Sequence, residues 1–389
     1  MNLAADLDIQ EAAAKTWEVA VVGAGPAGAF AAQQLAQSGV EVLLIDKQRF
    51  PRYKVCGCCI NAHAVEILTN AGLFDILREH GAIDLESCEV YCKGQRGRVA
   101  LPGGLALSRE IFDAALVHEA KPAGARFLPE TKAALGPAAR GHRVLKLSQR
   151  QTELEIHARV VIGADGLTGT LRNAFAELAS QPAQSSFFGV GSVASLPSPQ
   201  FRPGVIYMGC SKGGYAGMVQ IENDKIAIAA ALAYASEKNP RTLAAGIARV
   251  LEEAELPFRP ALETLEWRGT PALTRRPKRI STERFFAIGD AAGYIEPFTG
   301  EGIVWALRSA LTAIPFVQRG VRNWTSTLEQ EWEQRYDAVI RRRQIACKAL
   351  TAMLRRPILF EGAVRLLQKH WLPVQPIINY LHRAPQPKS

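Results

Sequence analysis

The stretch from Trp17 to Lys47, WEVAVVGAGPAGAFAAQQLAQSGVEVLLIDK, constrains the fold of this chain more than any other. An apolar run at 19–22 is typical of a buried parallel strand, and a glycine turn follows it. An Ala-rich segment from about Pro26 predicts a helix, and a second apolar run ends at Asp46. Strand, helix and strand in this order form a βαβ unit, so the sequence predicts an α/β fold built on a parallel sheet.

The turn of this unit has the spacing of a Rossmann-like dinucleotide-binding site. The Gly-x-Gly-x-x-Gly pattern occupies Gly23, Gly25, Pro26, Ala27 and Gly28. Such glycines permit the tight turn, the approach of backbone to a pyrophosphate and close packing of helix on strand. The helix N-terminus then directs free N–H groups at the phosphates. Asp46 is placed to accept hydrogen bonds from a ribose, and an acid at that position favours FAD or NAD over NADP.

Two later strands favour FAD over NAD. HARVVIGADGLTGTLR, from His157, predicts a strand that ends at Asp165. RFFAIGDAAGYIEPFTGEGIVWALRSA, from Arg284, predicts a strand that ends at Gly289 and Asp290, followed by a helix from about Gly300. A plain NAD domain has no use for these polar groups, whereas the ribityl chain and ring of a flavin need them.

In this order the motifs resemble the FAD-dependent superfamily of single-component aromatic hydroxylases, flavin-dependent halogenases and geranylgeranyl reductases. PRYKVCG at 51–57 and GDAAGYIEPFTGEGI at 289–303 resemble the geranylgeranyl reductase branch closely. The resemblance covers roughly residues 17–310. It implies a p-hydroxybenzoate hydroxylase-like architecture, in which a β-rich substrate domain is inserted into the FAD domain.

The resemblance also implies roles for individual residues. Arg109 would lie on the phosphate or ribityl side of the cofactor, and Asp290 would bind a ribityl hydroxyl. Gly300 and Gly302 would present N–H groups to the flavin N1 and O2 edge, where a helix N-terminus stabilises negative charge. The further cofactor-binding positions are Asp46, Lys47, Lys54, Cys56, Gly57, Asp165, Gly289, Pro297 and Glu301.

The cysteine-rich stretch RYKVCGCCIN at 52–61 has several interpretations. A zinc knuckle needs a second pair, but Cys88 and Cys92 follow about 30 residues later without histidine partners, so we predict no metal site. A Cys58–Cys59 disulfide would be strained. Two interpretations stay open: the thiols pack a tight loop, or Cys56 meets substrate at the flavin face as proton donor or polar contact, as the reductase branch implies.

The middle of the chain departs from the family pattern. Gly169 occupies the position where the family has Ser after its Asp-Gly pair. The segment 213–234 predicts alternating strands but lacks the Tyr-x-Trp-x-Phe-Pro pattern of the reductase branch. Tyr215 in this segment either donates a proton to substrate or forms the wall of the site. The Trp-x-Trp-x-Ile-Pro signature of halogenases is missing from the sequence, so we do not expect halogenation.

The expected domains are discontinuous in sequence. We place the FAD-binding domain at 16–86, 101–176 and 268–320, the substrate domain at 87–100 and 177–267, and a C-terminal helical basic region at 321–389.

Most of the net charge of +9 belongs to this last region, which has 12 Lys and Arg against 5 Asp and Glu. The region is either a solvated helix packed by its apolar face or a surface that contacts anionic lipid or receives an acidic substrate. No nucleic-acid-binding motif accompanies the charge. The first residues lack the features of a signal peptide and no apolar run reaches about 18 residues, so we expect a cytoplasmic protein, with peripheral membrane contact an open alternative.

The sequence supports three functions. The first is an FAD-dependent oxidoreductase similar to geranylgeranyl reductases, acting on an apolar or aromatic small molecule by hydride transfer through flavin N5. The second is an FAD monooxygenase that hydroxylates an aromatic or polyketide-like substrate. Either enzyme would use NADH or NADPH as a transient reductant, because no second Gly-x-Gly-x-x-Gly segment follows. The third is a non-catalytic lipid escort, which has no need of the PFTGEG segment. The oligomeric state is not predicted.

Overall fold

The computed structural model describes residues 3–139, 141–171, 175–195, 201–233, 240–257, 262–296, 298, 300–354, 356–369, 371, 373 and 375–376. The α-helices are α1 (Ile9–Ala13), α2 (Pro26–Gln37), α3 (Ala62–Asn70), α4 (Phe74–Glu79), α5 (Arg109–Ala120), α6 (Pro240–Glu253), α7 (Gly302–Arg322), α8 (Thr327–Tyr336), α9 (Arg342–Leu354) and α10 (Pro357–Gln368). Shorter helical turns are η2 (Leu262–Thr264), η3 (Gly289–Ala292) and η4 (Asp337–Arg341).

The strands of the first half of the chain are β1 (Thr16–Val22), β2 (Val42–Ile45), β3 (Cys59–Asn61), β4 (Ile83–Asp84), β5 (Ser87–Cys92), β6 (Gln95–Ala100), β7 (Gly104–Ala106), β8 (Arg126–Leu128), β9 (Lys132–Ala139), β10 (His142–Gln149) and β11 (Thr152–Gly163). Those of the second half are β12 (Ser180–Pro182), β13 (Phe188–Ala194), β14 (Val205–Ser211), β15 (Gly214–Gln220), β16 (Ile226–Leu232), β17 (Arg268–Ala272), β18 (Arg275–Pro277), β19 (Ser281–Thr282) and β20 (Phe285–Ala287).

Within the described residues, the larger sheet has eight strands in the order β19-β20-β11-β1-β2-β8, with the hairpin β9–β10 added to β11. Strands β20, β11, β1, β2 and β8 run parallel. Strand β11 is 12 residues long, so its first half pairs with β10 and its second half with β1 and β20. All four residues of β2 are buried, as expected for a parallel strand covered on both faces.

Seven strands of the described chain form a second sheet, in the order β17-β13-β16-β15-β14-β5-β6. Strand β5 joins it by pairing parallel to β14, although the two strands are far apart in sequence. Strand β17 extends this sheet past position 267 to Ala272. The α/β fold class with a β-rich second part is therefore confirmed, while the domain boundaries stay a prediction.

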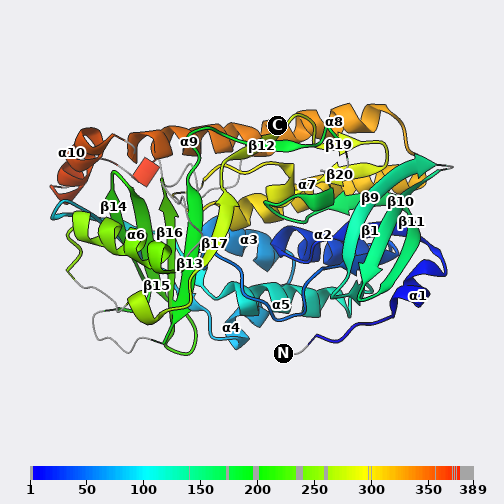
Figure 1. Cartoon of the computed structure of the whole chain (residues 1–389), viewed down its shortest axis with the longest axis horizontal. Coiled ribbons are helices and arrows are strands. Elements are labelled where there is room, and N and C mark those ends of the chain that lie inside the picture. The colour runs from blue at the N-terminus through cyan, green and yellow to red at the C-terminus, as the bar shows by residue number, and fades with distance from the viewer. Residues whose placement is uncertain are drawn as a thin grey trace.

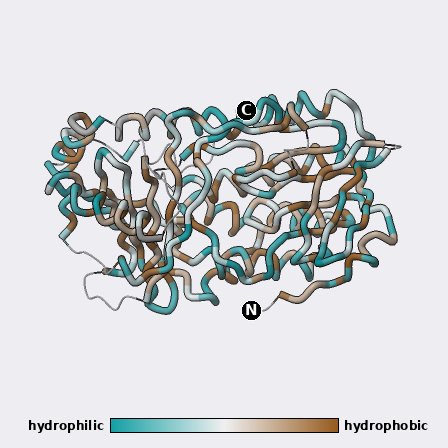
Figure 2. The backbone as a smooth tube through the Cα atoms, in the orientation of Figure 1, coloured by the Kyte–Doolittle hydropathy of each residue, from teal (hydrophilic) through white to brown (hydrophobic). Residues whose placement is uncertain are grey.

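The two sheets occupy opposite halves of an elongated molecule (Figure 1). Helices α2, α5 and α7 pack around the larger sheet, and α6 covers the second one. Helices α8 and α9 run along one long side, and α10 lies at the end remote from β9 and β10 (Figure 1). Hydrophobic segments run through the interior of both halves, whereas much of the outer chain is hydrophilic (Figure 2).

Candidate functional site

The register of the parallel strands brings the predicted motifs to one edge. Val22 pairs with both Ile45 and Gly163, and Gly163 pairs with Ala287. The last residues of four strands therefore stand in one row, and the loops that follow them meet at the carboxyl edge of the sheet. In open α/β sheets this edge is where ligands bind.

Two positions of the turn after β1 require a residue without a side chain. Gly23 has φ +104°, and a Cβ there would lie 2.3 Å from the carbonyl oxygen of Ala164. A Cβ on Gly28 would lie 1.8 Å from the carbonyl oxygen of Gly23. Gly28 therefore lets α2 pack against the turn.

Asp46 closes the second strand with its carboxylate held in place. Its oxygens accept hydrogen bonds from the backbone N–H groups of Ala24, at 2.7 Å, and Gln48, at 2.8 Å. Each carboxylate oxygen can accept a further bond. The group is fixed in the lining of the cavity described below.

Two arginines and one aspartate form a cationic clamp beside the start of α2. Arg109 donates to Asp113 from Nε at 2.6 Å and from Nη2 at 2.8 Å, and Arg52 pairs with the same carboxylate at 3.0 Å. The Asp113 carboxylate raises the pKa of Arg109 against the opposing effect of burial. A Cβ on Gly25 would lie 3.6 Å from Arg52 Nη2 and 3.8 Å from Arg109 Nη2. The free N–H groups of α2 and two guanidinium groups thus face one space.

Arg52 and Asp113 were not predicted as residues of the site. Asp113 follows Arg109 by four residues on one helix, which is the spacing of a helical ion pair. The sequence alone therefore indicates the Arg109–Asp113 pair. The pairing of Arg52 with a residue some sixty positions later had no sequence signal.

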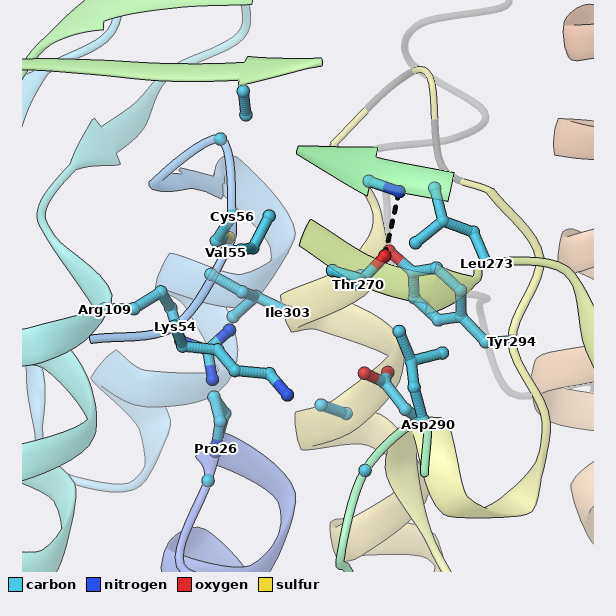
Figure 3. Close-up of a pocket in the computed structure, with 18 of the residues that line it drawn as sticks. Pro26, Lys54, Val55, Cys56, Arg109, Thr270, Leu273, Asp290, Tyr294 and Ile303 are labelled. Atoms are coloured by element: carbon cyan, nitrogen blue, oxygen red, sulfur yellow. Dashed lines mark hydrogen bonds between the residues drawn. The ribbon is translucent and has the colours of Figure 1, made fainter. Parts of the chain in front are cut away.

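Lys54 and Asp290 lie on opposite walls of the cavity. Figure 3 shows the Lys54 side chain pointing across the space toward Asp290, with Arg109 and Pro26 on the side of Lys54. Burial lowers the pKa of Lys54, and the charge of Asp290 partly opposes that effect. The space between them therefore has a cation on one side and a carboxylate on the other.

The loop after β11 keeps a polar contact despite its missing serine. Asp165 accepts hydrogen bonds from the Thr170 hydroxyl at 3.1 Å and from the Leu171 N–H at 2.9 Å. Thr170 therefore supplies a hydroxyl to this loop, one position after Gly169.

Helix α7 begins beside the cavity with two glycines. Gly300 has φ +75° and nothing within 4 Å of a Cβ added to it, and Gly302 is the first helical residue. Glu301, between them, is buried and accepts a hydrogen bond from Asn61 at 3.1 Å. Burial raises the pKa of Glu301 to about 8. The side chain of Glu301 is therefore buried and does not line the cavity.

The cysteines of the loop before β3 have different surroundings. Cys56 faces the cavity and its thiol interacts with the Arg109 guanidinium. Cys58 is buried, and Cys59 donates to the carbonyl of Gly57 at 3.2 Å. All seven cysteines are free thiols. Burial raises the pKa values of Cys58 and Cys59, so both stay protonated near neutral pH.

One continuous cavity of about 1800 Å³ joins the carboxyl edge of the larger sheet to the second sheet. Its far end lies between that sheet and α10, and is apolar. The residues that line the far end include Val90, Val99, Ile206, Met208, Met218, Phe360, Val364 and Leu367.

Tyr215 lies in the wall of this far end. Its ring meets Phe298 edge-on at a centroid distance of 5.1 Å, and its hydroxyl hydrogen-bonds the buried carboxyl of Glu296. Burial and that carboxyl raise the pKa of Tyr215, so the phenol stays protonated.

The cavity collects most of the positions that the sequence predicted. Lining it are Gly23, Gly25, Pro26, Ala27, Asp46, Lys47, Lys54, Cys56, Gly57, Arg109, Asp165, Tyr215, Asp290, Gly300 and Gly302. Gly28, Gly289 and Glu301 do not line it. Gly289 packs instead, with its N–H donating to Ser309 at 2.7 Å. Pro297 lies outside the described residues.

Comparison with known proteins identifies the family. A family model described as "FAD binding domain" matches residues 16–314. The chain belongs to this family of FAD-binding proteins. It is an FAD-dependent oxidoreductase, and the predicted flavin cofactor is confirmed as FAD.

Two relatives are named as reductases. The chain is 28% identical over 345 residues to the menaquinone reductase of Mycobacterium tuberculosis, covering 81% of this chain and 80% of that protein. It is 26% identical over 318 residues to digeranylgeranylglycerophospholipid reductase 1 of Methanothermobacter thermautotrophicus, covering 76% and 75%. The crystal structure of p-nitrophenol 4-monooxygenase from Pseudomonas putida has the same fold, with a TM-score of 0.76 at 13% identity over 94% of this chain and 96% of that one.

The residues at the sheet edge fit FAD. The absent Cβ of Gly25 leaves open the space between the α2 N-terminus and two guanidinium groups, which is the surrounding that a pyrophosphate requires. Small-molecule pockets typically measure about 300–1,000 Å³. A cavity of about 1800 Å³ therefore has room for FAD and for a second, large molecule.

Proposed function

We propose that this FAD-dependent oxidoreductase reduces a carbon–carbon double bond in an elongated apolar molecule, of the isoprenoid type, and takes its reducing equivalents from NADH or NADPH. The net reaction oxidises NAD(P)H to NAD(P)⁺ and adds its hydride, with one proton from solvent, across the double bond. The observation that carries this proposal is the apolar far end of the cavity, continuous with the FAD site.

The far end is suited to an aliphatic chain rather than to a small polar ring. Aliphatic side chains and methionines from β5, β6, β14, β15 and α10 dominate its lining. Burying each methylene of a ligand there contributes about 0.8 kcal/mol. The second sheet, with α10 against it, thus acts as the substrate-binding part of the protein.

In this proposal the sheet edge holds FAD through residues from several loops. Arg52, Arg109 and the α2 N-terminus bind the pyrophosphate, and Asp46 accepts from the adenosine ribose. Asp290 accepts from a ribityl hydroxyl, and the N–H groups at Gly300 and Gly302 face the flavin N1 and O2 edge. Glu301 stands between these two glycines, with its side chain accepting a hydrogen bond from Asn61.

Bound FAD supplies hydride transfer from its N5. The chain's own residues then have to orient the double bond and provide a proton. Cys56 is the candidate for the second task, because its thiol faces the cavity beside the Arg109 guanidinium. We assign Tyr215 to the wall, because its hydroxyl is engaged by Glu296.

The names of the two relatives support this reading. One is a reductase of menaquinone and the other a reductase of a digeranylgeranyl phospholipid. Both names describe the reduction of large apolar molecules. The alternative predicted from the sequence, hydroxylation of an aromatic or polyketide-like substrate, shares the fold of the p-nitrophenol enzyme but finds less support in an aliphatic pocket.

The test uses the FAD-loaded protein with NADH or NADPH and a geranylgeranylated lipid or a polyprenyl quinone as probe, with and without oxygen. We expect the product, by mass spectrometry, to gain two hydrogen atoms per reduced double bond, equally well without oxygen. A product that gains an oxygen atom, and forms only in air, would refute the reductase and establish the monooxygenase. NAD(P)H consumption without any change in either probe, while shorter aromatic compounds react, would refute the elongated substrate.

A further inference from the structure

Helix α10 has apolar side chains on two faces. Phe360, Val364 and Leu367 face inward and line the cavity. Leu359 and Leu366 are 54% and 40% exposed. They lie seven residues apart, hence on one face of the helix. A helix that is apolar on its exposed face as well as on its buried face normally contacts another protein surface or a membrane.

A tryptophan adds to the exposed apolar side chains near the end of α10. Trp371, just past the end of α10, is 72% exposed, and the Lys369 ammonium lies 5.2 Å from its ring centroid. We call Leu359, Leu366, Trp371, Arg365 and Lys369 the α10 patch. An amphipathic aromatic ring beside a long cationic side chain is typical of protein surfaces at the water–lipid boundary.

The charges around the α10 patch are mainly positive. Arg356, Arg365 and Lys369 are exposed at the two ends of the helix. The acid on α10, Glu361, pairs with Arg365 at 3.0 Å and with Lys93 at 3.1 Å, so its charge is compensated. Cations around exposed leucines and a tryptophan complement an anionic lipid surface.

A second copy of the chain is a poorer partner for this surface. A two-fold contact through the α10 patch would bring the cations of both copies, Arg365 and Lys369, into one interface. Like charges brought together at an interface oppose association. An anionic bilayer instead accepts the leucines in its outer layer and the cations at its headgroups.

We propose that the α10 patch docks the protein on the surface of an anionic bilayer. Helix α10, which carries the patch, lies at one end of the elongated molecule (Figure 1). The same helix forms the inner wall of the apolar end of the cavity, so docking brings that end next to the acyl layer. Of the described residues, no helix is both long and apolar enough to span a bilayer. In this proposal the contact is peripheral.

The test measures binding of the FAD-loaded full chain to vesicles of phosphatidylcholine alone and of phosphatidylcholine with phosphatidylglycerol, by flotation and by Trp fluorescence. It requires no substrate, so its result is independent of the proposed reaction. We expect binding only to the anionic vesicles, weakened by added salt. The double variant Leu359→Ser/Leu366→Ser and the double variant Arg365→Gln/Lys369→Gln should each weaken it about tenfold or more.

The matched control is Leu311→Ser, which removes another exposed leucine, 46% exposed, from α7. It should bind vesicles as the unaltered protein does, and all variants should retain their FAD content. Equal binding by the unaltered chain and both double variants would overturn the proposal, as would a loss of the same size in Leu311→Ser. A dimer in solution that Leu359→Ser/Leu366→Ser converts to monomer would show that a second copy covers the patch instead.

Discussion

Asp113 is the residue on which the cationic clamp depends, and Asp113→Asn tests it. The carboxylate is fully buried and receives Arg109 through two hydrogen bonds, at 2.6 and 2.8 Å, and Arg52 at 3.0 Å. Asparagine keeps the shape but loses the charge, and it turns an NH2 group toward one of the guanidinium donors. Two buried cations then share one neutral acceptor.

The size of the effect follows from burial. Breaking a buried ion pair by removing one partner costs about 3–5 kcal/mol, because the remaining charge is left desolvated. The chain also contains an exposed bidentate pair, in which Arg78 donates to Asp84 from Nη1 at 2.8 Å and from Nη2 at 2.6 Å. Its side chains are 41% and 64% exposed, and such pairs contribute about 0–1 kcal/mol. Asp84→Asn is therefore the control in which the same substitution removes a bidentate arginine pair at the surface.

We expect Asp113→Asn to lower the free energy of unfolding of the apoprotein by about 3 kcal/mol, and Asp84→Asn by less than about 1 kcal/mol. Because the clamp faces the space beside Gly25, we also expect Asp113→Asn to raise the Kd for FAD about tenfold to a hundredfold, or about 1.4–2.8 kcal/mol. Denaturant unfolding and titration of FAD fluorescence measure the two quantities. Equal losses of stability in the two variants, or an unchanged Kd in Asp113→Asn, would refute the reasoning.

Three further variants test other parts of the site. Cys56→Ser should keep normal FAD content with turnover reduced about tenfold or more, since general acid catalysis contributes on that scale; unchanged turnover would make the thiol a packing residue. Because burial raises the pKa of Glu301 to about 8, the folded protein holds a proton that the unfolded chain has lost between about pH 4.5 and pH 8, so the free energy of unfolding falls as pH rises through that window. Glu301→Gln should flatten that fall, and melting curves of equal pH dependence in variant and parent would contradict this assignment. Ala363→Phe, in the α10 wall, should raise KM for a long-chain substrate while leaving the Kd for FAD unchanged.

The residues proposed to bind the cofactor could be predicted because they belong to short sequence patterns. An apolar run, a Gly-x-Gly-x-x-Gly turn and Asp46 follow one another within one βαβ unit, and parallel pairing alone carries their loops to one edge. Asp165 and Asp290 were predicted in the same way, since each follows a strand that joins that sheet.

What could not be predicted depends on contacts between distant segments. The Arg52–Asp113 pair forms only when the loop before β3 meets α5. Glu301 was predicted as a cofactor-binding residue from its place at a helix start, whereas its buried hydrogen bond with Asn61, 240 residues earlier, has no sequence signal. The sequence shows that an acid stands at a helix start. The direction of its side chain depends on which neighbouring group can form a hydrogen bond with it.

The far end of the cavity also depends on contacts between distant segments. It therefore distinguishes the part of the site that the family match covers from the part that belongs to this chain. The family match ends at residue 314, whereas Phe360, Val364 and Leu367, on α10, close the apolar wall. Helix α10 can lie on β6 because Gly97 has no side chain: a Cβ there would come within 2.5 Å of the Leu367 Cδ2. Family membership accounts for the FAD site, but the width and length of the apolar end depend on how closely α10 packs against that glycine. Differences in substrate between this chain and its relatives should therefore be sought first at the contact between α10 and β6.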